Sequence, residues 1–270
     1  MRMAAPCLLA CLLASPPAGA HDKWIEAEPF RLPAPGRVKL YLATGDGLRD
    51  AELRPLRRRA AVSRLQLHSS AGKRDLLAAL REDQQPIAVL EEGRVPAGTL
   101  IVALDAAPID IELTASRFES YLFAERLFDV LAQRARGDRE DAPVRERYSR
   151  CLKAVLQVGD RLDKLAQKPV GQELEIVPQQ HPYGLTPSTT LTVQVLFRGK
   201  PLAGRALSCA NRFRSALASR TVRTDGSGKA TCPVSRGGDW MLSLVHMEPG
   251  KEEGVDWRSY WASLTFALPE

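Results

Sequence analysis

Cysteine, aromatic residues and long hydrophobic runs are all scarce in this sequence. Of the 270 residues, 5 are cysteine and 6% are aromatic. No CxxC pair occurs, which argues against a structural zinc site. The aromatic residues do not alternate with the basic ones, so we expect no nucleic-acid binding. After residue 20 no apolar stretch reaches the roughly 20 residues of a membrane helix, and we expect no integral membrane segment there.

The sequence also lacks the common catalytic motifs. GxSxG, HExxH, the P-loop and the dinucleotide fingerprint do not occur. The glycine-rich segments "GDG" at Gly45–Gly47 and "TDGSG" at Thr224–Gly228 are typical of tight turns rather than phosphate cradles. We therefore expect a protein that is not an enzyme.

The first twenty residues are typical of a secretory signal peptide. Arg2 precedes a short apolar run, "APCLLACLLA" at residues 5–14, and the tail ends in the small residues Ala18-Gly19-Ala20. The segment "LLAC" ending at Cys11 resembles a lipoprotein cleavage box, but few apolar residues precede it. We predict a signal peptide over 1–20, with cleavage after Ala20 and a mature chain of 21–270.

The charge balance is mildly basic. The formal net charge is +6, and the densest basic stretch is "RPLRRR" at Arg54–Arg59. Such a stretch is typical of a solvated strand end or loop, and it is also compatible with contact to acidic polymers or anionic lipid headgroups. The sequence leaves both interpretations open.

Hydrophobic residues mostly repeat with a period of two before residue 114. The runs "RVKLYLAT", "VSRLQLHS", "TLIVALDA" and "IDIELTA" alternate, and Gly- and Pro-containing turns separate them. Short strands at this spacing indicate a β-sandwich. At about 100–150 residues per domain, the length favours two domains, and we assign the first to 21–172.

The period then changes to that of a helix. Apolar residues follow helical spacing from Ser116 to Arg136, with a capping box at Ser116 and Glu119. We predict a second helix from Pro143 to about Val158. Together these helices would form a hairpin, about 116–158, packed on the first sandwich.

The period-two pattern returns from Leu174 onward. Alternating runs are separated by the turns "RGKPLAG", "TDGSGK" and "RGGDW". This order predicts a second domain over 173–270 with an immunoglobulin-like β-sandwich. The expected fold class is therefore mainly β, with two immunoglobulin-like or transthyretin-like β-sandwich domains and a helical hairpin insertion.

Three cysteines remain after the signal peptide. Alternation places Cys209 and Cys232 on inward-facing sides of their strands, so their sulfurs could meet. An exported protein reaches a compartment that permits disulfides. A Cys209–Cys232 disulfide and two buried free thiols are both possible, and we expect Cys151 to be buried and inert.

Several segments resemble a known family when taken in order. These segments are "AHDKWIEAEPFRLPAPGRVKLYL", "FESYLFAERLFDVLAQRARG", "VRERYSRCLKAVLQVG", "VQVLFRGKPLAGRALSC", "TDGSGKATCPV", "GGDWMLSLVHM" and "DWRSYWASLTF". They are similar to a bacterial periplasmic family with a domain of unknown function, formerly described as a nickel-uptake transporter component.

The resemblance implies an all-β fold with a helical insertion, a periplasmic location and a role in handling divalent transition metals. It also implies an inner-membrane or envelope transport component as partner. This chain departs from the family at two places. Cys151 stands where an aromatic residue is more usual, and "GDG" at Gly45–Gly47 replaces a turn that often carries a histidine.

Cleavage after Ala20 would leave His21 at the N-terminus. Its α-amine and ring Nδ1 could chelate one ion, because both groups lose their protons near neutral pH. Imidazole suits copper, nickel and zinc. We expect His246 to supply a third nitrogen, since it ends an otherwise apolar strand face and lies in a segment that matches the family.

Three acidic residues are candidates for an additional ligand or for orienting a histidine ring. They are Asp22, Glu26 and Asp256. The expected ligand is a divalent transition metal ion: Ni, Co, Cu or Zn. Alternatively, His21 is a frayed chain end and His246 a hydrogen-bonded edge histidine. The protein would then be a metal-free interaction module of the cell envelope.

Overall fold

The computed structural model describes residues 21–269 except 94, 138–140, 187 and 235. The predicted signal peptide, 1–20, lies outside the described residues. The described chain is mainly β and sandwich-like with a small helical insertion, which confirms the expected class. It contains three sheets, which we name the N-terminal, central and C-terminal sheets.

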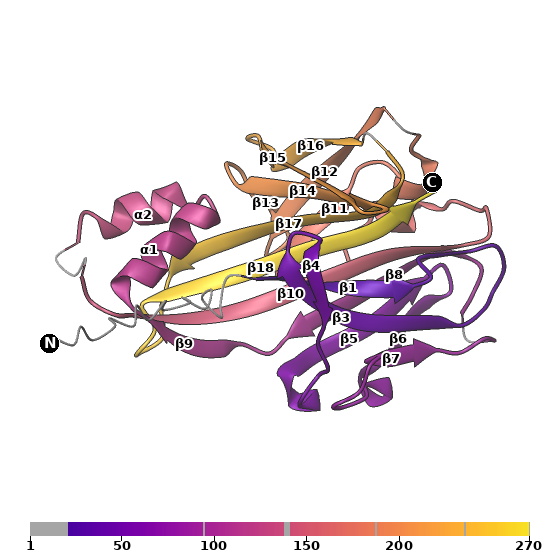
Figure 1. Ribbon diagram of the computed structural model, residues 1–270, viewed down its shortest axis with the longest axis horizontal. Helices are drawn as coiled ribbons and strands as arrows, with labels where there is room; N and C mark the ends of the chain where they lie inside the picture. The colour runs from indigo at the N-terminus through magenta and orange to yellow at the C-terminus, as the bar shows by residue number, and fades with distance from the viewer. Residues whose placement is uncertain (1–20, 94, 138–140, 187, 235, 270) are drawn as a thin grey trace, which may run out of the picture.

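The central sheet is the largest and runs through the middle of the molecule (Figure 1). The N-terminal sheet comprises β1 (Asp22–Glu28), β3 (Val38–Asp46), β4 (Arg49–Leu53) and β7 (Ala88–Leu90). The C-terminal sheet comprises β11 (Leu174–Pro178), β12 (Thr189–Phe197), β13 (Lys200–Pro201) and β16 (Lys229–Val234). The central sheet comprises β15 (Ala216–Arg223), β14 (Ala206–Phe213), β17 (Gly238–Pro249), β18 (Trp257–Leu268), β10 (Val144–Val158), β8 (Gly98–Ala106), β5 (Val62–Ser69) and β6 (Gly72–Asp75), with β2 (Arg31–Leu32) and β9 (Ile109–Leu113) attached to β10.

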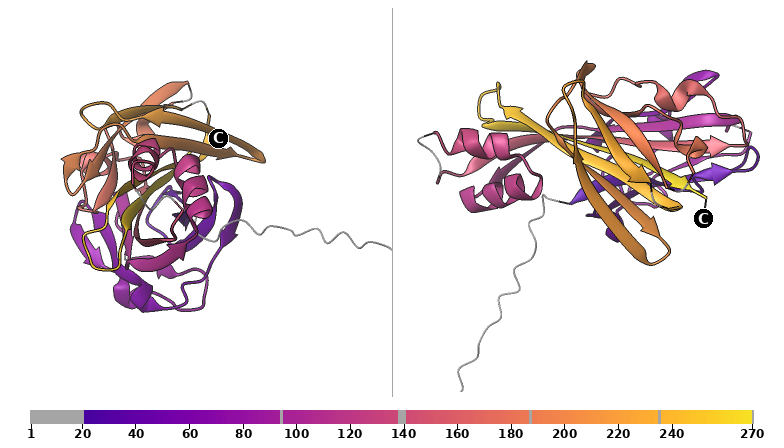
Figure 2. Two further views of the ribbon diagram at one scale, coloured as in Figure 1. Left: turned by 90° about the vertical axis from the view of Figure 1, so that its left-hand side faces the viewer. Right: turned by 90° about the horizontal axis from the view of Figure 1, so that it is seen from above.

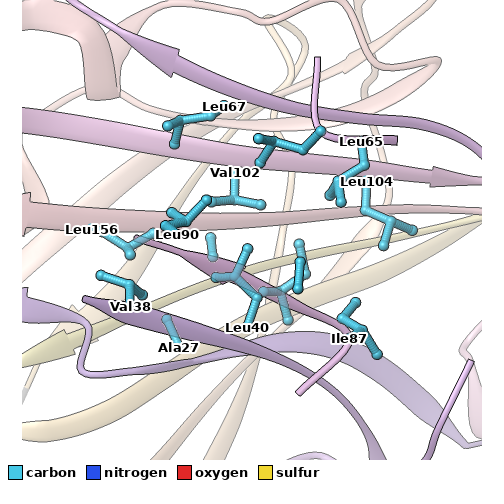
Figure 3. Packing of buried hydrophobic residues seen from close by; sticks show 14 of the residues in the cluster. Ala27, Val38, Leu40, Leu65, Leu67, Ile87, Leu90, Val102, Leu104 and Leu156 are labelled. Carbon is cyan, nitrogen blue, oxygen red and sulfur yellow. The ribbon is translucent and has the colours of Figure 1, made fainter. Parts of the chain in front are cut away.

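The two outer sheets cover opposite faces of the central sheet. One apolar cluster joins the N-terminal sheet to strands β5, β8 and β10, as Val38, Leu40, Leu65 and Leu156 show in Figure 3. A second cluster joins the C-terminal sheet to β14, β17 and β18. The helices α1 (Ala115–Ala124) and α2 (Phe128–Arg134) lie at one end of the long axis (Figure 2). They cover the same face of the central sheet as the N-terminal sheet. Along β10, β17 and β18, the residues that pack against the helices alternate with those that pack against the C-terminal sheet, so the two sets point to opposite faces.

The prediction of a helix over 143–158 is wrong, because this segment forms the long strand β10. From Ser149 to Val158 every residue is buried, since β10 lies between β18 and β8 and is covered on both sides. Leu152 and Leu156 pack toward the N-terminal sheet, and Cys151 and Val155 toward the C-terminal sheet. A strand buried on both faces loses the alternation that normally reveals it.

The helical insertion is a pair of short helices. The helix predicted over 116–136 is broken between α1 and α2, where Arg126 adopts a positive φ of 57°. The N-cap is Thr114, whose hydroxyl accepts a hydrogen bond from the Arg117 amide at 3.4 Å. The N-cap is therefore Thr114 rather than the Ser116 predicted from the sequence. Phe118 and Leu122 bury the apolar side of α1 against Trp257 and its neighbours.

The two predicted domains contribute strands to one sheet. Strand β10, from the predicted first domain, pairs in parallel with β18, from the predicted second domain. The buried Lys153 ammonium also donates hydrogen bonds to the Glu175 carboxylate and, at 3.0 Å, to the Ile176 carbonyl of β11. The boundary predicted at 172/173 thus separates segments that share the central sheet.

The cysteines behave as alternation suggested. Cys209 of β14 and Cys232 of β16 form a disulfide, with their Cα atoms 6.0 Å apart, that ties the central sheet to the C-terminal sheet. Cys151 is a free, buried thiol, and burial raises its pKa to about 12. Such a thiol is almost wholly protonated at neutral pH and is therefore unreactive.

Candidate metal site

The first described residue, His21, lies beside a carboxylate. Strand β1 pairs with β3 so that Asp22 is opposite Gly45. This register places the His21 ring next to Asp46, with the Nδ1 and Oδ1 atoms 3.6 Å apart. His21 Nδ1 is inaccessible to solvent and makes no hydrogen bond within the described residues. Within the described residues, the His21 ring nitrogen and the Asp46 carboxylate are therefore close to each other, and neither makes a hydrogen bond to another residue.

Successive residues of β1 face opposite ways. His21 and Lys23 line one hollow, and Asp22 lines a second, smaller one together with Glu125 and Ser243. The Asp22 carboxylate accepts a hydrogen bond from the Gly47 amide at 3.0 Å. Burial raises the pKa of Asp22, and this hydrogen bond and the positive charge of Arg150 only partly oppose the rise.

Glu125 brings a second carboxylate to the same region. It follows the last residue of α1, where the two helices meet. Burial, followed by the negative charge of Asp22, raises its pKa to about 8; Asp46 acts in the same direction and Arg150 opposes it. Glu125 is therefore mostly protonated at neutral pH.

We name the region formed by Asp22, Glu125, Arg150 and Ser243 the polar seam. It lies between the N-terminal sheet and α1, over the central sheet. Arg150 is buried there, and its guanidinium carbon lies 4.6 Å from the centre of the Trp261 ring. One guanidinium thus faces two carboxylates in the seam and the nearby Asp46. An added cation would reduce the repulsion among these carboxylates.

His246 lies on the other face of the central sheet. On β17 it shares a side with Leu242 and Leu244, which pack toward the C-terminal sheet. Its ring centre lies 4.4 Å from that of Phe197 and 6.2 Å from that of Tyr260. Burial, and then the positive charge of Arg205, lower its pKa to about 4. The structure therefore does not bring His21 and His246 together, since the buried central sheet separates them.

Two of the acidic candidates also have other partners. Glu26 accepts hydrogen bonds from Arg212 and, at 3.0 Å, from the Trp24 indole. Asp256 accepts a hydrogen bond from the Arg145 amide at 2.8 Å, in the loop between β17 and β18. Of the three acidic candidates, only Asp22 lies in the region of His21 and Asp46.

Sequence reasoning missed Asp46, Glu125 and Arg150. Asp46 was visible only as the middle residue of the "GDG" turn. Glu125 and Arg150 lie in segments expected to be helical and carry no local signal. Across the described ranges, no three His, Cys, Asp or Glu side chains already surround a common point tightly enough to hold a metal.

These features define a mainly β, sandwich-like protein with a polar seam at the start of its first strand. No helix in the described part of the chain is long and apolar enough to cross a membrane. The chain belongs to the family of the domain of unknown function DUF4198, whose model matches residues 18–248. The family description names neither a metal nor a transport role. A comparison with curated proteins found no match.

Proposed function

We propose that this is a periplasmic protein that binds a divalent transition metal ion at its processed N-terminus. The proposal includes the signal peptide over 1–20 and its cleavage after Ala20. The ion would be nickel, cobalt, copper or zinc. The observation that carries the proposal is the 3.6 Å approach of the His21 ring to Asp46, beside the carboxylates of the polar seam.

The residues around His21 fit such an ion chemically. A free α-amine and the ring Nδ1 of one histidine close a six-membered chelate, and the Asp46 carboxylate supplies an oxygen. This mixture of nitrogen and oxygen donors suits borderline divalent metals. Asp22 and Glu125 would contribute negative charge, and Glu125 would release its proton when the cation arrives. His246, Glu26 and Asp256 are left out of this proposed site because they lie elsewhere or have other partners.

The proposed role is binding and delivery, without catalysis. The expected partner is an inner-membrane or envelope transport component that takes up the ion. The competing proposal is a metal-free interaction module of the cell envelope. The two differ in whether metal changes the stability of the protein or its capture of a partner, so one series of measurements separates them.

The test compares a chain that begins at His21 with one that carries an extra glycine before it. Calorimetry with Ni(II) and with Cu(II) should show about one ion per chain for the first protein. The added glycine replaces the chelating α-amine with an amide, so affinity should fall at least about tenfold. Asp46→Asn should cause a loss of similar size, whereas Asp141→Asn, which changes an exposed residue, should not.

Two results would contradict the proposal. Equal affinity with and without the extra glycine would show that the α-amine is not a ligand. If metal neither binds nor shifts the melting temperature, while the protein still captures an envelope partner, the interaction module would be the better description.

A further inference from the structure

The hollow lined by His21 and Lys23 adjoins the proposed metal site and, unlike the polar seam, is lined by positively charged side chains. It has a volume of about 760 Å³ and lies between strands β1 and β3 and the segment that follows β4. Its cationic lining consists of Lys23, Arg54, Arg57 and Arg58, with His21 also on its wall. No acidic side chain is among the described residues that line it. Volumes of about 300–1,000 Å³ are usual for small-molecule sites.

Much of this positive charge is not neutralised by the protein. Arg57 and Arg58 make no side-chain hydrogen bond or ion pair within the described chain. Arg54 is paired with Glu52. Lys23 adds another cationic side chain to the same lining. A bound anion would therefore reduce the repulsion among these like charges.

The segment that carries the arginines is held firmly in place. Leu56 is buried in the cluster beneath the N-terminal sheet. The Arg54 carbonyl accepts a hydrogen bond from Gln85, and the Arg54 amide donates one of 2.9 Å to the Leu42 carbonyl. The Arg59 guanidinium donates a hydrogen bond of 2.8 Å to the Leu80 carbonyl. Arg57 and Arg58 thus project from a fixed backbone between anchored neighbours.

We propose that this hollow binds a small multivalent oxyanion of the carboxylate or phosphate class. Planar guanidinium groups recognise such oxyanions with paired hydrogen bonds. The hollow has the size of a small-molecule site, and none of the described residues that line it is aromatic and able to stack on a nucleic-acid base. The inference goes beyond the proposed metal function, since it depends on the arginines and not on the processed α-amine.

The experiment measures the binding of two probes, citrate and pyrophosphate, by calorimetry at low salt in metal-free buffer. The purified protein should bind at least one of them with about one site per chain, and added salt should weaken the binding. The probe that binds more tightly identifies the class of oxyanion.

Two double variants test the location of the site. Arg57→Gln with Arg58→Gln should weaken binding at least about tenfold, because it removes two charged hydrogen-bond donors. Arg117→Gln with Arg220→Gln removes the same charge from exposed arginines elsewhere and should change affinity less than about twofold. Melting temperatures of both variants should match that of the wild type, because all four side chains are exposed.

Three outcomes would overturn the proposal. The first is failure of the wild-type protein to bind either probe. The second is equal weakening in the two double variants, which would indicate only a general charge effect. The third is binding to vesicles of phosphatidylglycerol without binding to citrate or pyrophosphate, which would indicate a membrane surface instead.

Discussion

The two faces of the central sheet are covered in different ways. The C-terminal sheet covers one face with a large apolar cluster and a disulfide. The N-terminal sheet and the two helices share the other face, and the polar seam lies between them. The single sheet on the first face permits close apolar packing. On the other face, the N-terminal sheet and the helices leave a junction where they meet. The polar residues of the seam occupy that junction.

The polar residues of the two faces therefore differ in their roles. Those under the C-terminal sheet stabilise the fold, whereas those in the polar seam could bind a ligand or exchange a proton. The apolar face contains one buried ion pair, Lys153 with Glu175, in which the Glu175 carboxylate also accepts three backbone hydrogen bonds. In the seam, burial raises the pKa of both Asp22 and Glu125, and the negative charge of Asp22 adds to the rise at Glu125. The comparison can be tested at single residues on each face.

The largest expected effect comes from removing the buried charge on the apolar face. Lys153→Met would leave the Glu175 carboxylate buried without its cation, and breaking such a pair costs about 3–5 kcal/mol. We expect the free energy of unfolding, measured with urea, to fall by about 3 kcal/mol, because the backbone donors to Glu175 remain. The control Lys200→Met changes an exposed lysine and should cost less than about 0.5 kcal/mol. A loss of similar size in both variants would refute the assigned role of the pair.

An intermediate effect is expected in the seam and depends on pH. The pKa of Glu125 is raised to about 8 in the folded protein, from an ordinary value of 4.5. Between these values the folded state holds a proton that the unfolded chain has released, so stability falls as pH rises. Allowing for partial solvent screening, we expect the free energy of unfolding of the metal-free protein to fall by about 2 kcal/mol between pH 5 and 8.

Glu125→Gln tests this slope, because glutamine does not titrate. The variant should show a shallower decline, although Asp22 continues to contribute in the same direction. Glu253→Gln, at an exposed loop position, should keep the wild-type slope. Urea denaturation at several pH values measures all three proteins. An unchanged slope in Glu125→Gln would show that Glu125 does not titrate as proposed.

The smallest effect is expected at His246. Its low pKa leaves it neutral at neutral pH, and its aromatic neighbours Phe197 and Tyr260 would accommodate another ring. His246→Phe should change the free energy of unfolding by less than about 1 kcal/mol. It should also leave metal affinity unchanged by calorimetry. A loss of metal affinity would instead support the histidine pair expected from the sequence.

The sequence predicts most of the strands of this fold, including the buried β8, but not β10. Strands β3, β5 and β8 were recognisable from alternation or from apolar runs between turns. The parity of Cys209 and Cys232 permitted the disulfide that the structure shows, but did not distinguish it from two free thiols. Strand β10 was not recognisable, because burial on both faces gives it apolar residues at helical as well as strand spacing. Its parallel pairing with β18, 110 or so residues later, left no local trace in either segment.

The candidate site was only partly predictable for the same reason. His21 could be selected because its position relative to the cleavage motif gives it a special chemistry. Asp46 approaches His21 only through the pairing of β1 with β3. Glu125 and Arg150 approach Asp22 only because α1 and the N-terminal sheet pack on the central sheet. His246 was selected for its place on an apolar strand face. That criterion identifies a buried ring but not which side of a sheet it faces.

The position of β18 has a consequence for how this chain can reach its folded state. Strand β18 inserts between β10 and β17, so the centre of the large sheet is completed by residues that lie more than 100 positions after their partners in β10 in the sequence. Contacts between distant segments form slowly, because long loops must close first. A nascent chain that still lacks Trp257–Leu268 would expose the edges of both neighbouring strands. Unpaired strand edges promote association with other chains, so the insertion of β18 also protects the sheet from edge-to-edge aggregation.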